Sequence, residues 1–124
     1  MGSRAVGIKG EVIAKEYLEK KGYRILETNY HTSYGEADII AFYKNTVIFI
    51  EVKSRTATDY GNPSEAVNRV KIKKYIMLAT DYMTKFKREY DVRFDIIEIL
   101  AESVIEHIEN AFDANDAAKY IKRY

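Results

Sequence analysis

The chain has 124 residues, which is enough for one hydrophobic core and too few for two, so we predict a single domain over 1–124. It contains no cysteine and only two histidines, His31 and His107. This excludes a disulfide framework and disfavours a zinc site, so carboxylates would have to hold any metal. No apolar run is long enough to span a bilayer, and the start of the chain lacks the apolar core of a signal peptide. We therefore expect a cytoplasmic protein with no membrane partner.

The charge is unevenly distributed along the chain. The formal net charge is +1, but residues 94–124 carry seven acidic and three basic side chains, a net of −4, so the first 93 residues carry +5. Such an asymmetry is compatible with a basic face and an acidic back, although a mixed solvated surface would give the same count.

The first half of the chain predicts one helix and three strands. Apolar residues recur at helical spacing over 4–21, and Gly22 follows as a stop signal. Three segments rich in Ile, Val, Phe and Tyr, separated by turn residues, predict strands over 23–30, 37–43 and 46–54.

The second half predicts a long helix and at least one more strand. Asn62 and Pro63 predict a helix that begins there and runs to about Arg88. A fourth strand is predicted over 92–100, a weaker fifth strand over 103–110 and a short helix over 113–124. The order αβββαβ indicates an α/β fold with a central mixed sheet flanked by helices, in which the second helix joins the third and fourth strands.

Four charged side chains interrupt the second and third strands, which are otherwise apolar on both faces. If Lys44–Asn45 forms a two-residue turn, Asp38 lies opposite Glu51 and Glu36 lies opposite Lys53. A register shifted by two residues would instead pair Asp38 with Lys53, and the cluster would remain. Two carboxylates facing each other destabilise a sheet unless positive charge lies between them.

Two explanations of this charged hairpin remain open. A divalent cation could bind between Asp38 and Glu51, with the Lys53 ammonium at the edge of the same site. The alternative is an internal ion-pair network in which Lys53 compensates one carboxylate and another is protonated or reaches solvent, with no chemistry attached.

Beyond the hairpin, a longer pattern resembles a known family. Asp38 followed by Glu51-Val52-Lys53 is similar to the signature of the restriction-endonuclease-like nuclease superfamily, which includes Holliday junction resolvases. The matching strings, together with Lys71, resemble the YraN-like family of uncharacterised proteins with that fold: GIKGEVIAKEYLEKKGYRILETNY, YGEADII, VIFIEVKSR, YGNPSEAV and RFDII. One departure is Ala37, where the superfamily often has proline.

The resemblance implies a restriction-endonuclease-like core and a catalytic site. Asp38 and Glu51 would be ligands of Mg²⁺ or Mn²⁺, the Val52 carbonyl would supply a third oxygen, and Lys53 would lie beside the attacking water. Glu11 resembles the first-helix glutamate of the resolvases and could reach the metal through water. As an alternative, Glu11 is an exposed helix carboxylate paired with Lys15.

Four residues are candidates for binding nucleic acid. Arg55, Lys71 and Lys74 place cations beyond the proposed metal site and on the next helix, where they could contact phosphates. Tyr60 could stack on a base or sugar. As alternatives, a lysine-rich helix surface is only solvated and a loop tyrosine packs against its own domain.

Together these features predict a metal-dependent nuclease that hydrolyses phosphodiester bonds in DNA. The analogy with resolvases extends this to branched or damaged DNA and to a symmetric homodimer. The competing hypotheses are a nucleic-acid-binding or scaffold protein with this fold and no significant cleavage, and a structural domain that binds neither magnesium nor DNA.

Overall fold

The computed structural model of the protein describes residues 3–55 and 69–112. Two helices and five strands lie in these ranges: α1 (Ser3–Lys20), β1 (Arg24–Thr32), β2 (Gly35–Tyr43), β3 (Thr46–Arg55), α2 (Arg69–Met83), β4 (Asp91–Leu100) and β5 (Ser103–Phe112). The predicted helix over 113–124, the predicted helix start at Asn62 and the candidate Tyr60 lie outside the described residues.

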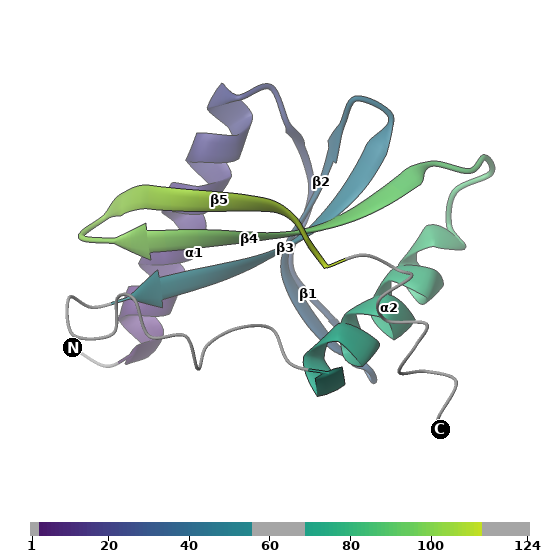
Figure 1. Ribbon diagram of the computed structural model, residues 1–124, viewed down its shortest axis with the longest axis horizontal. Coiled ribbons are helices and arrows are strands. Elements are labelled where there is room, and N and C mark those ends of the chain that lie inside the picture. Colours follow the sequence, from purple (N-terminus) through teal and green to yellow (C-terminus); the bar gives the residue numbers. More distant parts are fainter. Residues whose placement is uncertain (1–2, 56–68, 113–124) are drawn as a thin grey trace.

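The five strands form one mixed sheet in the order β1-β2-β3-β4-β5. Only the β3–β4 pair is parallel among these strands, and α2 provides the crossover between them, as predicted. Figure 1 shows the strong twist of the sheet, with β1 and β2 steeply inclined to β5. The predicted mixed α/β architecture is confirmed, and the weak fifth strand is present.

The central hairpin forms in the predicted register. Lys44 and Asn45 both have positive φ, 47° and 61°, as a two-residue type I′ turn requires. From there Tyr43 pairs with Thr46, and the Cα pairs continue inward as far as Ile39 with Ile50.

Each face of the sheet has its own core because each is covered by a helix (Figure 1). On one face, Ala14 and Leu18 of α1 pack with Ile39, Ile48 and Ile50. The other face is covered by α2, whose buried side chains pack against residues from the sheet that include Ile40, Val47, Phe49, Phe94 and Phe112. Both faces of β2 and β3 are therefore buried, which explains their nearly continuous apolar sequences.

The two helices end differently from each other. After α1, Gly22 takes φ 94° and Tyr23 N–H donates to the Leu18 carbonyl at 3.0 Å, a glycine-based C-terminal cap that confirms the predicted stop. The predicted extension of α2 to Arg88 is wrong, because the helix ends at Met83. Beyond it the backbone makes tighter bonds three residues apart, including Phe86 N–H to the Met83 carbonyl.

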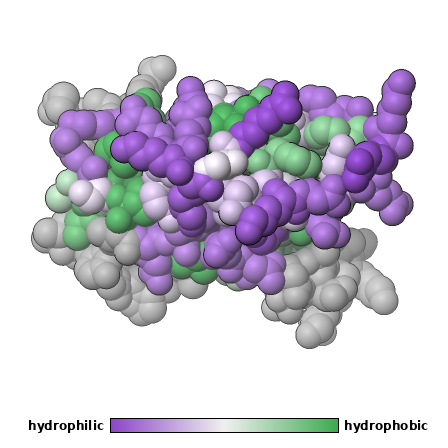
Figure 2. Space-filling view, turned by 90° about the horizontal axis from the view of Figure 1, so that it is seen from above, coloured by the Kyte–Doolittle hydropathy of each residue, from purple (hydrophilic) through white to green (hydrophobic). Residues whose placement is uncertain are grey.

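The surface offers no large apolar area on the face seen in Figure 2, where small apolar areas are separated by hydrophilic side chains. Neither described helix is long and apolar enough to cross a membrane.

Candidate functional site

The candidate site lies where β2 and β3 stop pairing. In the described strands the Cα register ends at Ile39 and Ile50, one residue before Asp38 and Glu51. There the Asp38 carboxylate accepts a hydrogen bond from Val52 N–H, with 2.8 Å between Oδ2 and N. The Asp38 side chain thus replaces a backbone carbonyl as the acceptor for Val52 N–H. This hydrogen bond holds Asp38 next to the Glu51-Val52-Lys53 segment.

Glu11 reaches this site from α1. Its carboxyl group hydrogen-bonds Asp38 and Asn29, so the structure supports the site-facing alternative over an exposed pair with Lys15. Burial and the neighbouring Asp38 charge raise the pKa of Glu11. Burial also raises the pKa of Asp38, as does the charge of Glu36, while the hydrogen bond from Val52 N–H opposes the rise. Two carboxyl groups in contact therefore favour a proton or a cation between them.

Lys71 reaches the same site from α2, on the other face of the sheet. Its ammonium forms an ion pair with Glu51 Oε1; the Lys71 side chain is 37% exposed and that of Glu51 is 13% exposed. Burial lowers the pKa of Lys71, and the charges of Asp38 and Glu36 oppose this shift. The second Glu51 oxygen, Oε2, is buried and has no hydrogen-bond partner among the described residues. Glu51 thus has one oxygen held by an ammonium and one oxygen with unused acceptor capacity.

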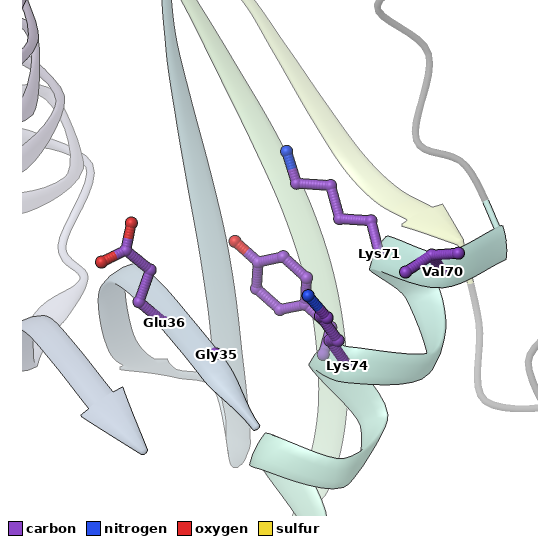
Figure 3. A pocket seen from close by; sticks show the side chains of 6 residues that line it. Gly35, Glu36, Val70, Lys71 and Lys74 are labelled. Carbon is purple, nitrogen blue, oxygen red and sulfur yellow. The ribbon is translucent and has the colours of Figure 1, made fainter. Parts of the chain in front are cut away.

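A pocket of about 360 Å³ opens beside this ion pair. Figure 3 shows Glu36 on β2 across the pocket from Lys71 and Lys74 on α2, and Tyr75 also lines it. Glu36 pairs with His31 at 2.7 Å between Oε2 and Nε2, and both side chains are mostly exposed. The structure therefore brings two of the predicted phosphate-binding lysines to a concave surface that borders the carboxylates.

The remaining predicted residues lie further along β3. Lys53 is half-buried and lies beside Glu98 in the parallel register of β3 and β4. Arg55 donates to Glu98 Oε1 from Nε at 3.1 Å and from Nη2 at 2.8 Å, with a side chain only 6% exposed. Arg55 is therefore committed to an internal ion pair and presents little surface to a ligand.

The residues present fit a hard divalent cation in part. Within residues 3–55 and 69–112, no group of three or more His, Cys, Asp or Glu side chains could hold a metal ion. Magnesium commonly uses one or two carboxylates and keeps several waters, however, so it does not need three. Asp38 and Glu51 are the two candidates, and the unpartnered Glu51 Oε2 is a suitable oxygen donor.

The sequence patterns missed one member of this site and one of its pairings. The first is Asn29, which hydrogen-bonds Glu11 and has φ 51°, a backbone conformation that asparagine adopts more readily than most residues. The second is the partner of Glu51, which is Lys71 from another element, whereas we had considered Lys53 on the same strand.

A second buried network lies on the α1 face, away from these residues. The Asp95 side chain is fully buried and accepts from Arg93 Nε at 2.9 Å, from Arg93 Nη2 at 2.8 Å and from Asn110 N–H at 3.0 Å; its Oδ2 lies 2.8 Å from His107 Nε2. Burial raises the pKa of Asp95, but these hydrogen bonds outweigh burial and lower it overall. The network joins β4 to β5.

These observations define a mixed α/β domain with a carboxylate and lysine site at the open end of its central hairpin. Residues 10–99 match the uncharacterised protein family UPF0102, and the chain belongs to this family. The predicted YraN-like membership is thereby confirmed.

Relatives in several bacteria match over almost their whole length. A UPF0102 protein of Thermodesulfovibrio yellowstonii is 49% identical over 86% of this chain and 95% of its own. One of Alkaliphilus metalliredigens is 49% identical over 89% of this chain and 99% of its own. One of Caldanaerobacter subterraneus subsp. tengcongensis is 44% identical over 90% and 98%. These matches show the family, and a proposal about activity has to come from the site.

Proposed function

We propose that this protein is a metal-dependent nuclease of the restriction-endonuclease-like type, acting on phosphodiester bonds in DNA. The observation that carries the proposal is the position of Asp38 where β2 and β3 part, with Glu11 beside it and the hydrogen bond from Val52 N–H holding it at β3. The residue before Val52, Glu51, has one buried oxygen without a hydrogen-bond partner among the described residues. Such an arrangement leaves excess negative charge in a partly buried place, and a divalent cation would neutralise it.

In this proposal Asp38 and Glu51 would hold Mg²⁺ or Mn²⁺, with the Val52 carbonyl as a further oxygen. The bound metal would lower the pKa of a water and neutralise charge on the phosphate. Lys53 would orient the attacking water or stabilise the developing oxyanion. Glu11 would accept a hydrogen bond from water at the α1 side of the site.

The pocket supports nucleic acid as the substrate class. Lys71 and Lys74 line it next to the carboxylates, so a phosphate placed there would contact cations on one side and the reacting groups on the other. Arg55 contributes to this proposal only indirectly, by fixing Glu98 beside Lys53.

One observation favours a second function. Because Lys71 already neutralises part of the Glu51 charge, the same residues could form a structural ion-pair network in a protein that binds nucleic acid without cleaving it. The two functions differ in whether a divalent metal binds and whether DNA is cut.

The test is cleavage of labelled single-stranded, duplex and four-way-junction DNA with Mg²⁺ or Mn²⁺. Asp38→Asn retains an acceptor for Val52 N–H, and Glu51→Gln retains the side-chain volume, so each removes charge with little change in shape. Lys44→Ala, in the exposed turn at the other end of the hairpin, is the matched control. Metal-dependent cleavage that is lost in both site variants and kept in the control supports the nuclease. DNA binding without cleavage by the folded wild type would refute it in favour of the second function.

A further inference from the structure

Lys71 pairs with Glu51, one of the two proposed ligands of the divalent cation. This position suggests that Lys71 has a role beyond binding phosphate. It belongs to α2, whereas the carboxylates around it come from β2 and β3. Its ammonium pairs with Glu51 Oε1 and also interacts electrostatically with Asp38 and Glu36. Lys71 is therefore a cation that balances part of the negative charge of this site.

A metal ion on the unpartnered Oε2 of Glu51 would lie close to the Lys71 ammonium on Oε1 of the same carboxylate. The two cations repel each other, and the Glu51 side chain is only 13% exposed, so water screens this repulsion poorly. A divalent ion bound through Oε2 would therefore weaken the ion pair between Lys71 and Oε1 by repulsion and favour departure of the ammonium.

The displaced lysine has a place to go. The Lys71 side chain lines the pocket of about 360 Å³ that borders the site, together with Lys74. Figure 3 shows the pocket open beside the Lys71 side chain. A rotation of its flexible four-carbon chain would move the ammonium from the carboxylate to a phosphate in that pocket.

We infer that Lys71 is a competing cation that occupies Glu51 in the metal-free protein and is released to the nucleic-acid phosphate when a divalent metal binds. This inference rests on the proposed metal site. It couples the two ligands: metal binding frees one phosphate contact, and by reciprocity bound nucleic acid strengthens metal binding by the same factor.

The first test measures Mn²⁺ binding without DNA, from the loss of the free-ion electron paramagnetic resonance signal. Lys71→Met removes the competing charge and keeps a long side chain. Lys74→Met makes the same charge change in the same pocket, at a residue whose side chain is exposed. We expect Lys71→Met to bind Mn²⁺ about tenfold more tightly than wild type, the factor that corresponds to a charge-assisted hydrogen bond, and Lys74→Met to change affinity less than about twofold.

The second test uses the salt dependence of binding to an oligonucleotide whose integrity is checked after each measurement. Without metal, wild type and Lys71→Met should have equal slopes of log affinity against log salt concentration. With Mn²⁺, the slope for wild type should be steeper than the slope for Lys71→Met by the amount that corresponds to about one phosphate contact. Lys71→Arg retains a cation at this position and should keep wild-type Mn²⁺ affinity, which gives a second measurement if Lys71→Met does not fold.

The outcomes separate this inference from the proposed function. Equal Mn²⁺ affinity of wild type and Lys71→Met, or equal gains in Lys71→Met and Lys74→Met, would overturn the competition while leaving metal-dependent cleavage intact. If wild type and all variants bind no Mn²⁺, both the proposed metal site and the role of Lys71 are refuted.

Discussion

Replacing Gly10 by alanine should reveal how closely α1 lies against the sheet. Gly10 is buried, and a Cβ atom added there would overlap Ser54 Oγ on β3 and lie 3.4 Å from Ser54 Cβ. Overpacking of this kind costs about 1–3 kcal/mol, and alanine recovers about 0.9 kcal/mol over glycine in a helix. We therefore expect Gly10→Ala to lower the free energy of unfolding by up to about 2 kcal/mol.

The thermal shift follows from the chain length. An unfolding entropy of about 2.1 cal/mol/K per residue over 124 residues is about 0.26 kcal/mol/K, so the melting temperature should fall by up to about 8 °C. The assay is thermal unfolding followed by circular dichroism, with denaturant titration as a second estimate of the free energy.

Ser54→Ala is the matched partner for a double-mutant cycle. It removes Oγ, which is buried and has no hydrogen-bond partner in the described part of the chain, so the single variant should be neutral or slightly stabilising. In that background Gly10→Ala meets only the tight but tolerable 3.4 Å contact and should stabilise the protein by up to about 1 kcal/mol. An equal loss in both backgrounds would refute the close approach of α1 to Ser54.

Three further predictions concern charged groups. Burial raises the pKa of Asp38 above its ordinary value of 3.8, so ionisation of Asp38 lowers the free energy of unfolding as pH rises from 3.8 through the raised pKa. With a chelator present, Asp38→Asn should therefore have a higher melting temperature than wild type at pH 7. The difference should vanish towards pH 3.5, where Asp38 is protonated. The pKa of Asp95 is lowered, so its contribution to stability is present above pH 3.8 and lost as pH falls further. Asp95→Ala removes the buried carboxylate that Arg93 and His107 share, while Arg93 keeps Glu109 as a partner, so it should cost about 1.5–3 kcal/mol in denaturant titration. A loss below about 0.5 kcal/mol would contradict the network. Arg55→Ala should lower the melting temperature because it leaves Glu98 buried without this partner. The double variant Arg55→Ala/Glu98→Ala should recover part of the loss. An unchanged melting temperature in the single variant would show that this ion pair does not stabilise the fold.

The central hairpin could be predicted because its determinants are local. Lys44 and Asn45 fill the two positive-φ positions of the turn, and this turn fixes which residues face each other as far as Ile39 and Ile50. Asp38 and Glu51 follow directly from that register. Their position at the open end of the hairpin could therefore be predicted before any tertiary contact was known.

The end of α2 could not be predicted from periodicity. Phe86 continues the apolar stripe of the helix and packs against the same core, but it does so from a turn that follows Met83. The spacing of apolar residues indicates which side chains reach the core, but not the backbone conformation that places them there. A tighter turn places Phe86 against the core as well as a further α-helical turn would.

The pairing of the site residues was also beyond local patterns. Glu51 pairs with Lys71, twenty positions along the chain in the crossover helix, and Glu11 meets Asp38 from the opposite helix. Neither contact follows from strand alternation or helical spacing. Both depend on how the two helices lie across the sheet.

That convergence makes the site a reporter of the whole fold. Glu11 on α1, Asp38 on β2 and Lys71 on α2 come together only when both helical layers are docked, so a ligand of this site binds the native state alone. A ligand at 100 times its dissociation constant then stabilises the protein by about 2.7 kcal/mol, which at about 0.26 kcal/mol/K raises the melting temperature by about 10 °C. Melting scans against metals, nucleotides and oligonucleotides would thus be sufficient to screen for the natural ligand without an assay of any activity.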